Sequence, residues 1–474
     1  MVSETFYLPG GDDISSTVLC NDEILRIYRN PESFREAVSI LNIIQGEPRL
    51  NGLVVPTTIQ NSAQENFTLQ HDTLSFNLPE NWTLNQYVEV VEAHLELLRI
   101  LAENGLTLKD HLPENFVLNQ GNPVFVDFGS IVKKSARNQI PWINQLRGDK
   151  SVEKYLISEL MFPFLLLPLF VGLINSEKEM RQILKFEYCN SGLPALSRKR
   201  ISFKNLFFAF SPSISFKVCL FLLSKKFFKS EIKTLSKGVQ LSKLLLSSLN
   251  RTSNYLDYYK KKDEEFDLDD PRYWNDKQIT VRNLISREKP KDILDLGCNT
   301  GWFSLLATKN NCKVKAIDID SVIVDHLHLQ AKREHLPIEP SVLDFETLAF
   351  FKGITLSDNG LSSTCSRKLP KSSYDADLVL ALGLIHHLVL GLGYSLERVM
   401  ELLSSLARET LVLEFVSLND DKILSEQDFF PAFNQSKSSY TKENVIIFGL
   451  NYFEKVEVFP SNPDTREILV FGRS

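Results

Sequence analysis

The glycine-rich stretch Asp295-Leu-Gly-Cys-Asn-Thr-Gly301 predicts how the second half of this chain folds. It follows the apolar pair Ile293-Leu294 and leads into Trp302-Phe-Ser-Leu-Leu-Ala307, which indicates a strand, a tight turn and the start of a helix. Backbone N–H groups at such a turn can reach a small polar or anionic ligand. Gly297 can adopt a positive φ and Gly301 lets the helix pack closely, because neither has a Cβ atom. We therefore expect a ligand-binding turn.

Acidic residues follow at the ends of the next predicted strands. Val314-Lys-Ala-Ile317 ends in Asp318-Ile-Asp320, about twenty residues beyond the turn, where a carboxylate can accept both hydroxyls of a ribose. A third strand ends in Ser341-Val-Leu-Asp344. The apolar run Ala376-Asp-Leu-Val-Leu-Ala-Leu382 is typical of a strand buried on both faces, and it leads into Gly383-Leu-Ile-His-His387. These landmarks predict a doubly wound α/β sheet; acids that merely cap helices are the alternative.

The spacing Asp-x-Gly-x-Asn-x-Gly differs from the Gly-x-Gly-x-x-Gly of dinucleotide-binding proteins. It resembles motif I of the class I S-adenosylmethionine (AdoMet) methyltransferases. The resemblance implies a Rossmann-like seven-stranded sheet, completed by Leu411–Val416 and a terminal hairpin of Lys455–Phe459 and Glu467–Phe471. It implies AdoMet as the cofactor and no metal ion. It also implies a set of cofactor-binding residues, with Asp344 near the adenine amine: Asp295, Gly297, Asn299, Gly301, Asp318, Ile319 and Asp344.

His386 and His387 are the candidate catalytic residues. They follow the predicted fourth strand, at the edge where open α/β sheets bind ligands. The methyl group of AdoMet is already activated, so the protein mainly aligns the nucleophile and, for a poorly acidic acceptor, supplies a base. Histidine suits that role near neutral pH. The alternative is that one of them only packs or caps the next helix. Glu414 is a second candidate, with an inward structural acid as its alternative.

The first half contains a second set of spaced polar residues. Short alternating runs up to about residue 80 predict small antiparallel strands, and apolar spacing from Leu84 to Gly105 predicts a helix. Beyond it, Asp110, Asn115 and Asp127-Phe-Gly129 resemble the catalytic and metal-binding loops of protein kinases. No Gly-x-Gly-x-x-Gly loop and no Val-Ala-Ile-Lys strand is evident upstream, so the groups that position a nucleotide for phosphoryl transfer are missing. We expect a structural relic; a ligand site without turnover is the alternative.

A further resemblance covers nearly the whole chain. It rests on the kinase-like stretch, on Tyr258-Tyr259 and on Leu382-x-Leu-Ile-His-His-Leu388, together with Pro141-Trp142, Phe162 and Leu167-Pro168. These features resemble the nodulation-protein-like AdoMet methyltransferases, in which a degenerate kinase-like half precedes the methyltransferase domain. At Phe128-Gly129 this sequence keeps a kinase-like pair where relatives usually differ.

The length of 474 residues predicts two or three domains. We expect a degenerate kinase-like α+β domain over residues 1–160 and a helical, basic segment over 161–250. A class I AdoMet methyltransferase domain then covers 251–474. The fold class is therefore α/β, with an α+β kinase-like domain and a helical segment ahead of the Rossmann-like sheet.

Charge is distributed unevenly along the chain. The net charge is −6, yet Arg198 to Lys262 contains fifteen Lys and Arg against two acids. An interfacial amphipathic helix on an anionic membrane could use this pattern, and so could a helical subdomain that buries its phenylalanines. We expect the second, with no nucleic-acid partner; peripheral membrane contact remains the alternative.

Composition favours a cytoplasmic protein. The hydrophobic content of 43% and charged content of 24% are those of a soluble globular chain. Met1 to Phe6 does not read as a secretion signal, and the six cysteines lack metal-ligand spacing. The apolar stretch Leu160 to Ile174 is short for a membrane span and contains two prolines, which indicates a buried helical segment.

The sequence thus predicts an AdoMet-dependent methyltransferase that acts on a small-molecule or metabolite acceptor. An inactive methyltransferase fold that serves as a binding or scaffold protein is one alternative. A nucleotide-binding kinase-like module in the N-terminal half is another. The acceptor, the atom that is methylated and the oligomeric state stay open.

Overall fold

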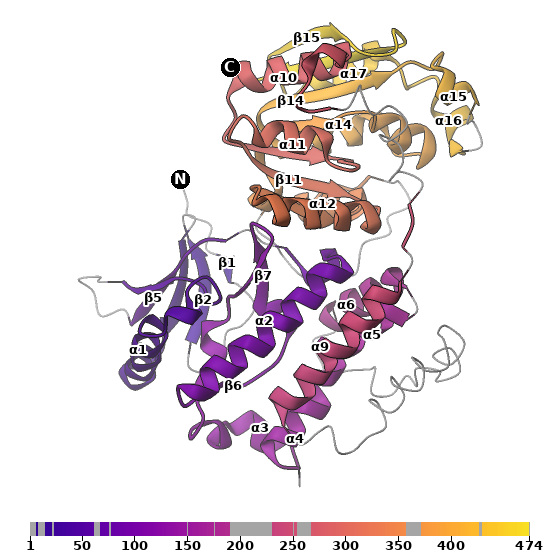
Figure 1. Ribbon diagram of the computed structural model, residues 1–474. Coiled ribbons are helices and arrows are strands. Elements are labelled where there is room, and N and C mark those ends of the chain that lie inside the picture. The colour runs from indigo at the N-terminus through magenta and orange to yellow at the C-terminus, as the bar shows by residue number, and fades with distance from the viewer. Residues whose placement is uncertain are drawn as a thin grey trace. The chain divides into compact units, whose positions relative to one another are not determined.

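The computed structural model separates the chain into two compact units, Met1–Asn250 and Arg251–Ser474 (Figure 1). The predicted division into three parts stays a prediction. Most of the basic stretch Arg198–Lys262, and the pair Tyr258-Tyr259, lie outside the described residues. The structure describes residues 6–7, 15–20, 23–60, 67–74, 77–148, 150–174, 176–189, 230–249, 251–253, 267–356, 371–425 and 429–473.

The first unit begins with a five-stranded antiparallel sheet in the order β1-β2-β3-β5-β4. Helix α1 (Pro31–Gln45) connects β3 to β4 and starts where the Asn30 side chain accepts a hydrogen bond from the Ser33 N–H at 2.8 Å. The small antiparallel strands predicted for this region are therefore present. The strands are β1 (Phe6–Tyr7), β2 (Ser15–Cys20), β3 (Glu23–Tyr28), β4 (Thr57–Ile59) and β5 (Thr68–His71).

Helix α2 (Leu84–Glu103) is the central helix of the first unit, and it confirms the predicted helix. Thr83 and Gln86 form a capping box at its start, and its apolar positions are buried. Helix α9 (Glu231–Ser248) packs against it. The apolar stretch around Leu160–Ile174 is helical, as predicted, and no helix among the described residues is long and apolar enough to cross a membrane. The other helices here are α3 (Pro141–Leu146), α4 (Val152–Tyr155), the π-helical segment Leu156–Leu166, α5 (Leu167–Ile174) and α6 (Glu177–Cys189).

Two short antiparallel strand pairs carry the kinase-like loops. Strand β6 (Leu106–Leu108) pairs with β9 (Ile131–Lys133), and β7 (Phe116–Asn119) pairs with β8 (Asn122–Phe125). The loops between these strands hold Asp110, Asn115 and Asp127. The pairing of these strands therefore brings the three side chains close together, although the residues are separated along the chain.

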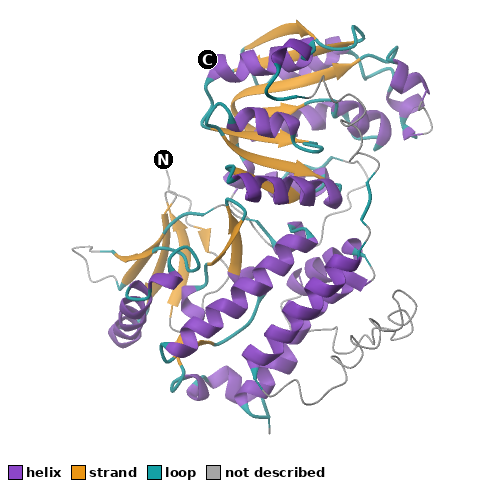
Figure 2. Cartoon of the chain, in the orientation of Figure 1, coloured by secondary structure: helices purple, strands orange, loops and turns teal. Residues whose placement is uncertain are grey.

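The second unit contains the predicted seven-stranded sheet, in the order β12-β11-β10-β13-β14-β16-β15 (Figure 2). The first five strands in this order are parallel, and β16 runs antiparallel between β14 and β15. The last two strands form the predicted terminal hairpin. The strands are β10 (Asp292–Leu296), β11 (Lys313–Asp318), β12 (Ile338–Val342), β13 (Ala376–Ala381), β14 (Ala407–Val416), β15 (Lys455–Pro460) and β16 (Arg466–Gly472).

Helices cover both faces of this sheet (Figure 2). Side chains of α10 (Asp276–Glu288), α11 (Trp302–Thr308) and α12 (Ser321–Glu334) share one hydrophobic core with the strands. Helix α14 (Leu396–Leu406) packs on β13 and β14 and against α17 (Lys442–Leu450). Strand β13 is buried along most of its length, which explains its near-continuous apolar sequence. The remaining helices are α13 (Phe345–Lys352), α15 (Asp421–Ser425) and α16 (Phe433–Ser436).

Candidate cofactor and catalytic site

The glycine-rich turn joins β10 to α11 in the conformation that its glycines were expected to permit. Gly297 has φ 68° and Gly301 has φ 83°, and the Gly297 N–H donates to the Ile317 carbonyl at 2.8 Å. A Cβ on Gly301 would lie 2.4 Å from Leu327 Cδ1. Asn299 also has a positive φ, of 52°. Position 301 therefore requires glycine, both for its positive φ and because Leu327 of α12 packs directly against it.

Asp318, at the end of β11, is joined to this turn. Its Oδ2 accepts the Asn299 N–H at 2.9 Å and its Oδ1 accepts the Asp320 N–H at 3.0 Å. Desolvation raises the pKa of Asp318, and these backbone donors oppose the shift. The next side chain, Ile319, is 73% exposed. An oriented carboxylate therefore lies beside an exposed apolar side chain. This arrangement suits a ligand that has two neighbouring hydroxyls and a flat apolar face.

Asp295 lies within β10 and is only 3% exposed. Its Oδ2 accepts a hydrogen bond from the Ser304 hydroxyl at 2.7 Å. Burial raises the pKa of Asp295 to about 6. The carboxylate is thus costly to keep ionised, which is typical of a functional position.

Asp295→Asn should raise the stability of the fold at neutral pH. The folded pKa of about 6 lies above the ordinary 3.8, so this carboxyl favours the folded state below pH 3.8 and loses that contribution as pH rises to about 6. At pH 7 the substitution should therefore stabilise by up to about 3 kcal/mol. Thermal melts at pH 4 and pH 7 measure this: the gain should be largest at pH 7 and small at pH 4. A lower melting temperature at pH 7 would contradict it.

Asp344 occupies the N-cap of α13. Its Oδ1 accepts the Thr347 N–H at 2.6 Å. The helix-cap role, which was the alternative for such acids, is therefore present at this position. The predicted contact with an adenine amine stays a prediction.

The two histidines differ in their surroundings. His386 is 8% exposed, whereas His387 is exposed, and their rings lie 4.1 Å apart beside Phe430. Burial, and then the adjacent His387, lowers the pKa of His386 to about 2. Its Nδ1 is buried and has no hydrogen-bond partner among the described residues. His386 is therefore a neutral hydrogen-bonding group, while the His387 side chain is exposed to solvent.

Glu414 is an inward structural acid, which was the alternative to a catalytic role. It is fully buried on β14, its Oε2 pairs with Lys277 Nζ at 2.7 Å, and its Oε1 accepts the Ser461 hydroxyl at 2.7 Å. Lys277, on α10, was not singled out from the sequence. Its partner is 137 residues away, so no local pattern could reveal the pair.

The kinase-like residues of the first unit also come together. Asp110 accepts hydrogen bonds from the Asn115 side chain and from the Ser130 hydroxyl, the latter at 2.7 Å. Ser130 Oγ also lies 2.5 Å from Asp127 Oδ2. A hydroxyl has one proton to donate, so Ser130 bridges two carboxyl groups that compete for it. Desolvation, and then the charge of Asp127, raises the pKa of Asp110.

Arg26, on β3, supplies a positive charge to this cluster. Its Nη2 lies 2.6 Å from Asp127 Oδ1, and the residue is 3% exposed. A Cβ on Gly129 would lie 1.7 Å from Arg26 Nη1, so the glycine of Asp-Phe-Gly makes room for the guanidinium. No Val-Ala-Ile-Lys strand is evident in the sequence. The structure shows an arginine that pairs with the Asp of Asp-Phe-Gly.

The sheet and the glycine-rich turn match the seven-stranded methyltransferase fold that the sequence predicts. Over 179 residues the chain is 28% identical to Nodulation protein NoeA of Rhizobium meliloti (strain 1021). This confirms the predicted resemblance to the nodulation-protein-like AdoMet-dependent methyltransferases, whereas the kinase-like half stays a prediction. The similarity covers 34% of this chain and 33% of NoeA, so the chain spans about a third of the length of the curated relative that it matches. No family model matches the chain.

Two solved structures are similar to part of the chain. The bifunctional kinase-methyltransferase WbdD is 18% identical, with a TM-score of 0.30, over 48% of this chain and 45% of WbdD. Magnesium protoporphyrin IX methyltransferase (ChlM) from Synechocystis PCC 6803, with bound SAH, is 14% identical, with a TM-score of 0.28, over 48% of this chain and 90% of ChlM.

Proposed function

We propose that the unit Arg251–Ser474 binds AdoMet at the carboxyl edge of its parallel strands and transfers the methyl group to a small-molecule acceptor. One observation carries this proposal: the backbone of the glycine-rich turn holds Asp318 through the Asn299 N–H at 2.9 Å, beside exposed Ile319. The strand order reverses between β10 and β13, next to this turn. Open α/β sheets bind ligands at such a switch point.

The residues at this edge fit the parts of AdoMet. A carboxylate has about four acceptor positions, so Asp318 can bind ribose hydroxyls while it keeps its two backbone donors. Ile319 offers an apolar surface for the adenine, with Asp344 as the proposed partner of its amine. Gly297, Asn299, Gly301 and the buried carboxylate of Asp295 would lie along the amino-acid end. The positive φ values and close packing of both glycines support this placement.

The two histidines would have different roles toward the acceptor. When bound, AdoMet supplies a methyl group on a positively charged sulfur, which makes the methyl group an electrophile. The imidazole of His386, which is 8% exposed, would orient the acceptor. The exposed imidazole of His387 would take the proton that the acceptor loses. The chain's remaining task is to align the acceptor with the methyl group.

His387→Gln should lower methyl transfer by about a hundredfold and leave AdoMet affinity unchanged, because general-base catalysis contributes about 10² to 10⁴ in rate. Initial rates and AdoMet titrations on the same preparation measure both quantities. Lys437→Gln, which removes an exposed cation from the end of α16, is the matched surface control and should change neither. An unchanged rate for His387→Gln would remove the base from the proposal.

A labelling experiment tests the acceptor class. The full chain is incubated with methyl-labelled AdoMet and with separated small-molecule and macromolecular fractions of a cell extract. We expect label in a small molecule, together with S-adenosylhomocysteine. Label only in macromolecules would refute the small-molecule acceptor. AdoMet binding without any transfer would favour the scaffold alternative.

For the first unit we propose a kinase-like accessory domain over residues 1–160, followed by a helical segment over 161–250. The antiparallel sheet, with α1 between β3 and β4, and the meeting of Asp110, Asn115 and Asp127 support it. Because Arg26 pairs with Asp127 Oδ1, the carboxylate that a metal ion would need is already paired with a cation. This favours a relic over a nucleotide-binding module. Cytoplasmic location and the absence of a nucleic-acid partner stay predictions.

A further inference from the structure

We propose that Arg251 and Ser253 are positioning residues that hold the ribose-binding loop Asp318–Asp320 in its working geometry. This inference rests on the proposed function, because it assigns a role at the same cofactor site. The two residues are the start of the second unit in the sequence. No motif of the sequence analysis marks them.

A series of hydrogen bonds leads from Ser253 to the carboxylate of Asp318. The Ser253 hydroxyl donates to Asp320 Oδ2 at 2.6 Å. Asp320 Oδ1 accepts the Val322 N–H at 2.9 Å, which caps α12, and the Asp320 N–H donates to Asp318 Oδ1 at 3.0 Å. Ser253 therefore fixes the side chain whose backbone orients Asp318.

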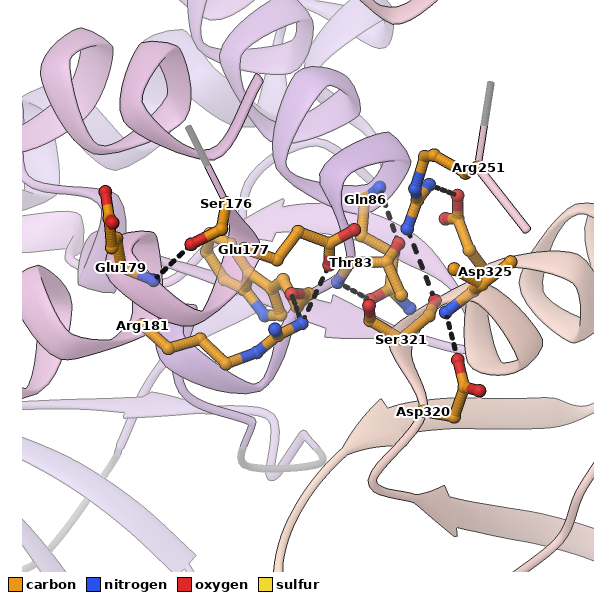
Figure 3. Close-up of polar contacts among 12 residues, drawn as sticks. Thr83, Gln86, Ser176, Glu177, Glu179, Arg181, Arg251, Asp320, Ser321 and Asp325 are labelled. Atoms are coloured by element: carbon orange, nitrogen blue, oxygen red, sulfur yellow. Dashed lines mark hydrogen bonds and ion pairs between the residues drawn. The ribbon is translucent and has the colours of Figure 1, made fainter. Parts of the chain in front are cut away.

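Arg251 holds the segment Arg251–Ser253 against the first turns of α12 (Figure 3). Its Nη1 pairs with Asp325 Oδ2, and its Nη2 donates to the Ser321 carbonyl at 3.5 Å. Asp325 is only 4% exposed, so the guanidinium neutralises a buried carboxylate. Residues 251–253 thus contact both the cap and the first turns of α12.

These contacts of Arg251 and Ser253 matter because a carboxylate that binds two neighbouring hydroxyls tolerates only about 0.5 Å of displacement. Without Ser253, Asp320 would still cap α12 through the Val322 N–H, so the helix and the fold should persist. The loop between Asp318 and Asp320 would lose its outer support. A positioning role therefore predicts a loss of AdoMet affinity that exceeds the loss of stability.

Calorimetric titration of the full chain with AdoMet, paired with thermal melts, tests this role. Ser253→Ala should weaken AdoMet binding about fivefold with little change in melting temperature, as expected for one lost hydrogen bond. Ser253→Thr keeps the hydroxyl and should restore most of the affinity. Arg251→Met should weaken binding at least as much and also lower the melting temperature.

Arg408→Met is the matched control. Arg408 pairs with Asp292 and Asp377 at the opposite edge of the same sheet, so its loss should lower the melting temperature and leave AdoMet affinity unchanged. Wild-type affinity in Ser253→Ala, or an equal loss of affinity in Arg408→Met, would overturn the positioning role. If the folded wild type itself fails to bind AdoMet, the proposed function fails and this inference fails with it.

Discussion

Asp318→Ala is expected to weaken AdoMet binding at least tenfold. The substitution removes the proposed acceptor of the ribose hydroxyls, and a hydrogen bond to a charged group contributes roughly 1.5 to 3 kcal/mol. It also leaves the Asn299 and Asp320 N–H groups without the acceptor that joins the two loops. Isothermal titration calorimetry on the full chain measures the affinity directly.

Asp292→Ala provides the matched control for this result. Asp292, like Asp318, accepts a backbone N–H, that of Asp377 at 2.8 Å. It also pairs with Arg408, and it lies at the end of β10 away from the glycine-rich turn. Its loss should leave AdoMet affinity unchanged. A folded Asp318→Ala variant with wild-type affinity would refute the ribose assignment.

Arg26→Met is expected to lower the free energy of unfolding by about 3 to 5 kcal/mol. Removing one partner of a buried ion pair leaves the other charge unpaired away from water, and that cost is of this size. Here the remaining charge is that of Asp127, which already competes with Asp110 for the Ser130 proton. Differential scanning calorimetry of the full chain measures the loss.

The double variant Arg26→Met/Asp127→Asn should recover much of this stability, because it removes both charges together. Asp127→Asn alone should lower the melting temperature as well. ATP with magnesium should leave the wild-type melting temperature unmoved if the cluster is a relic. A clear upward shift with ATP and magnesium that Asp127→Asn abolishes would instead make the first unit a nucleotide-binding module.

The glycine-rich turn and its neighbours could be predicted because their chemistry is local. Gly297 and Gly301 mark positions where the backbone needs φ > 0, and Asp318 follows a strand whose apolar sequence is easily recognised. The terminal hairpin of β15 and β16 is equally local, since alternation and order suffice to place it. The sheet itself was implied by the resemblance to class I methyltransferases, because β13 follows β12 in the chain but is separated from it in the sheet by β11 and β10.

The charge pairs could not be predicted, because they join residues far apart in the chain. Arg26 and Asp127 are separated by 101 residues, and Lys277 and Glu414 by 137. Asp127 and Glu414 stood out in the sequence, but nothing marked Arg26 or Lys277 as their partners. Only the fold brings each pair together, and the contacts of Glu414 with Lys277 and Ser461 assign its structural role.

The different surroundings of His386 and His387 also could not be predicted from the sequence. Adjacent His386 and His387 are equivalent in the sequence, yet burial lowers the pKa of His386 to about 2 while His387 remains exposed. The difference arises from the burial of His386 in the fold, which a local sequence pattern does not contain. The sequence thus pointed to both histidines as candidate bases. Only the structure distinguishes the buried ring from the exposed one.

Calorimetric titration of the full-length wild-type chain with AdoMet is the most direct test of the proposed cofactor site. We predict saturable binding of one AdoMet per chain, with Asp318→Ala binding at least tenfold more weakly. No heat of binding and no AdoMet-dependent rise in melting temperature, from a wild-type chain shown to be folded, would contradict a methyltransferase that uses the turn Asp295–Gly301.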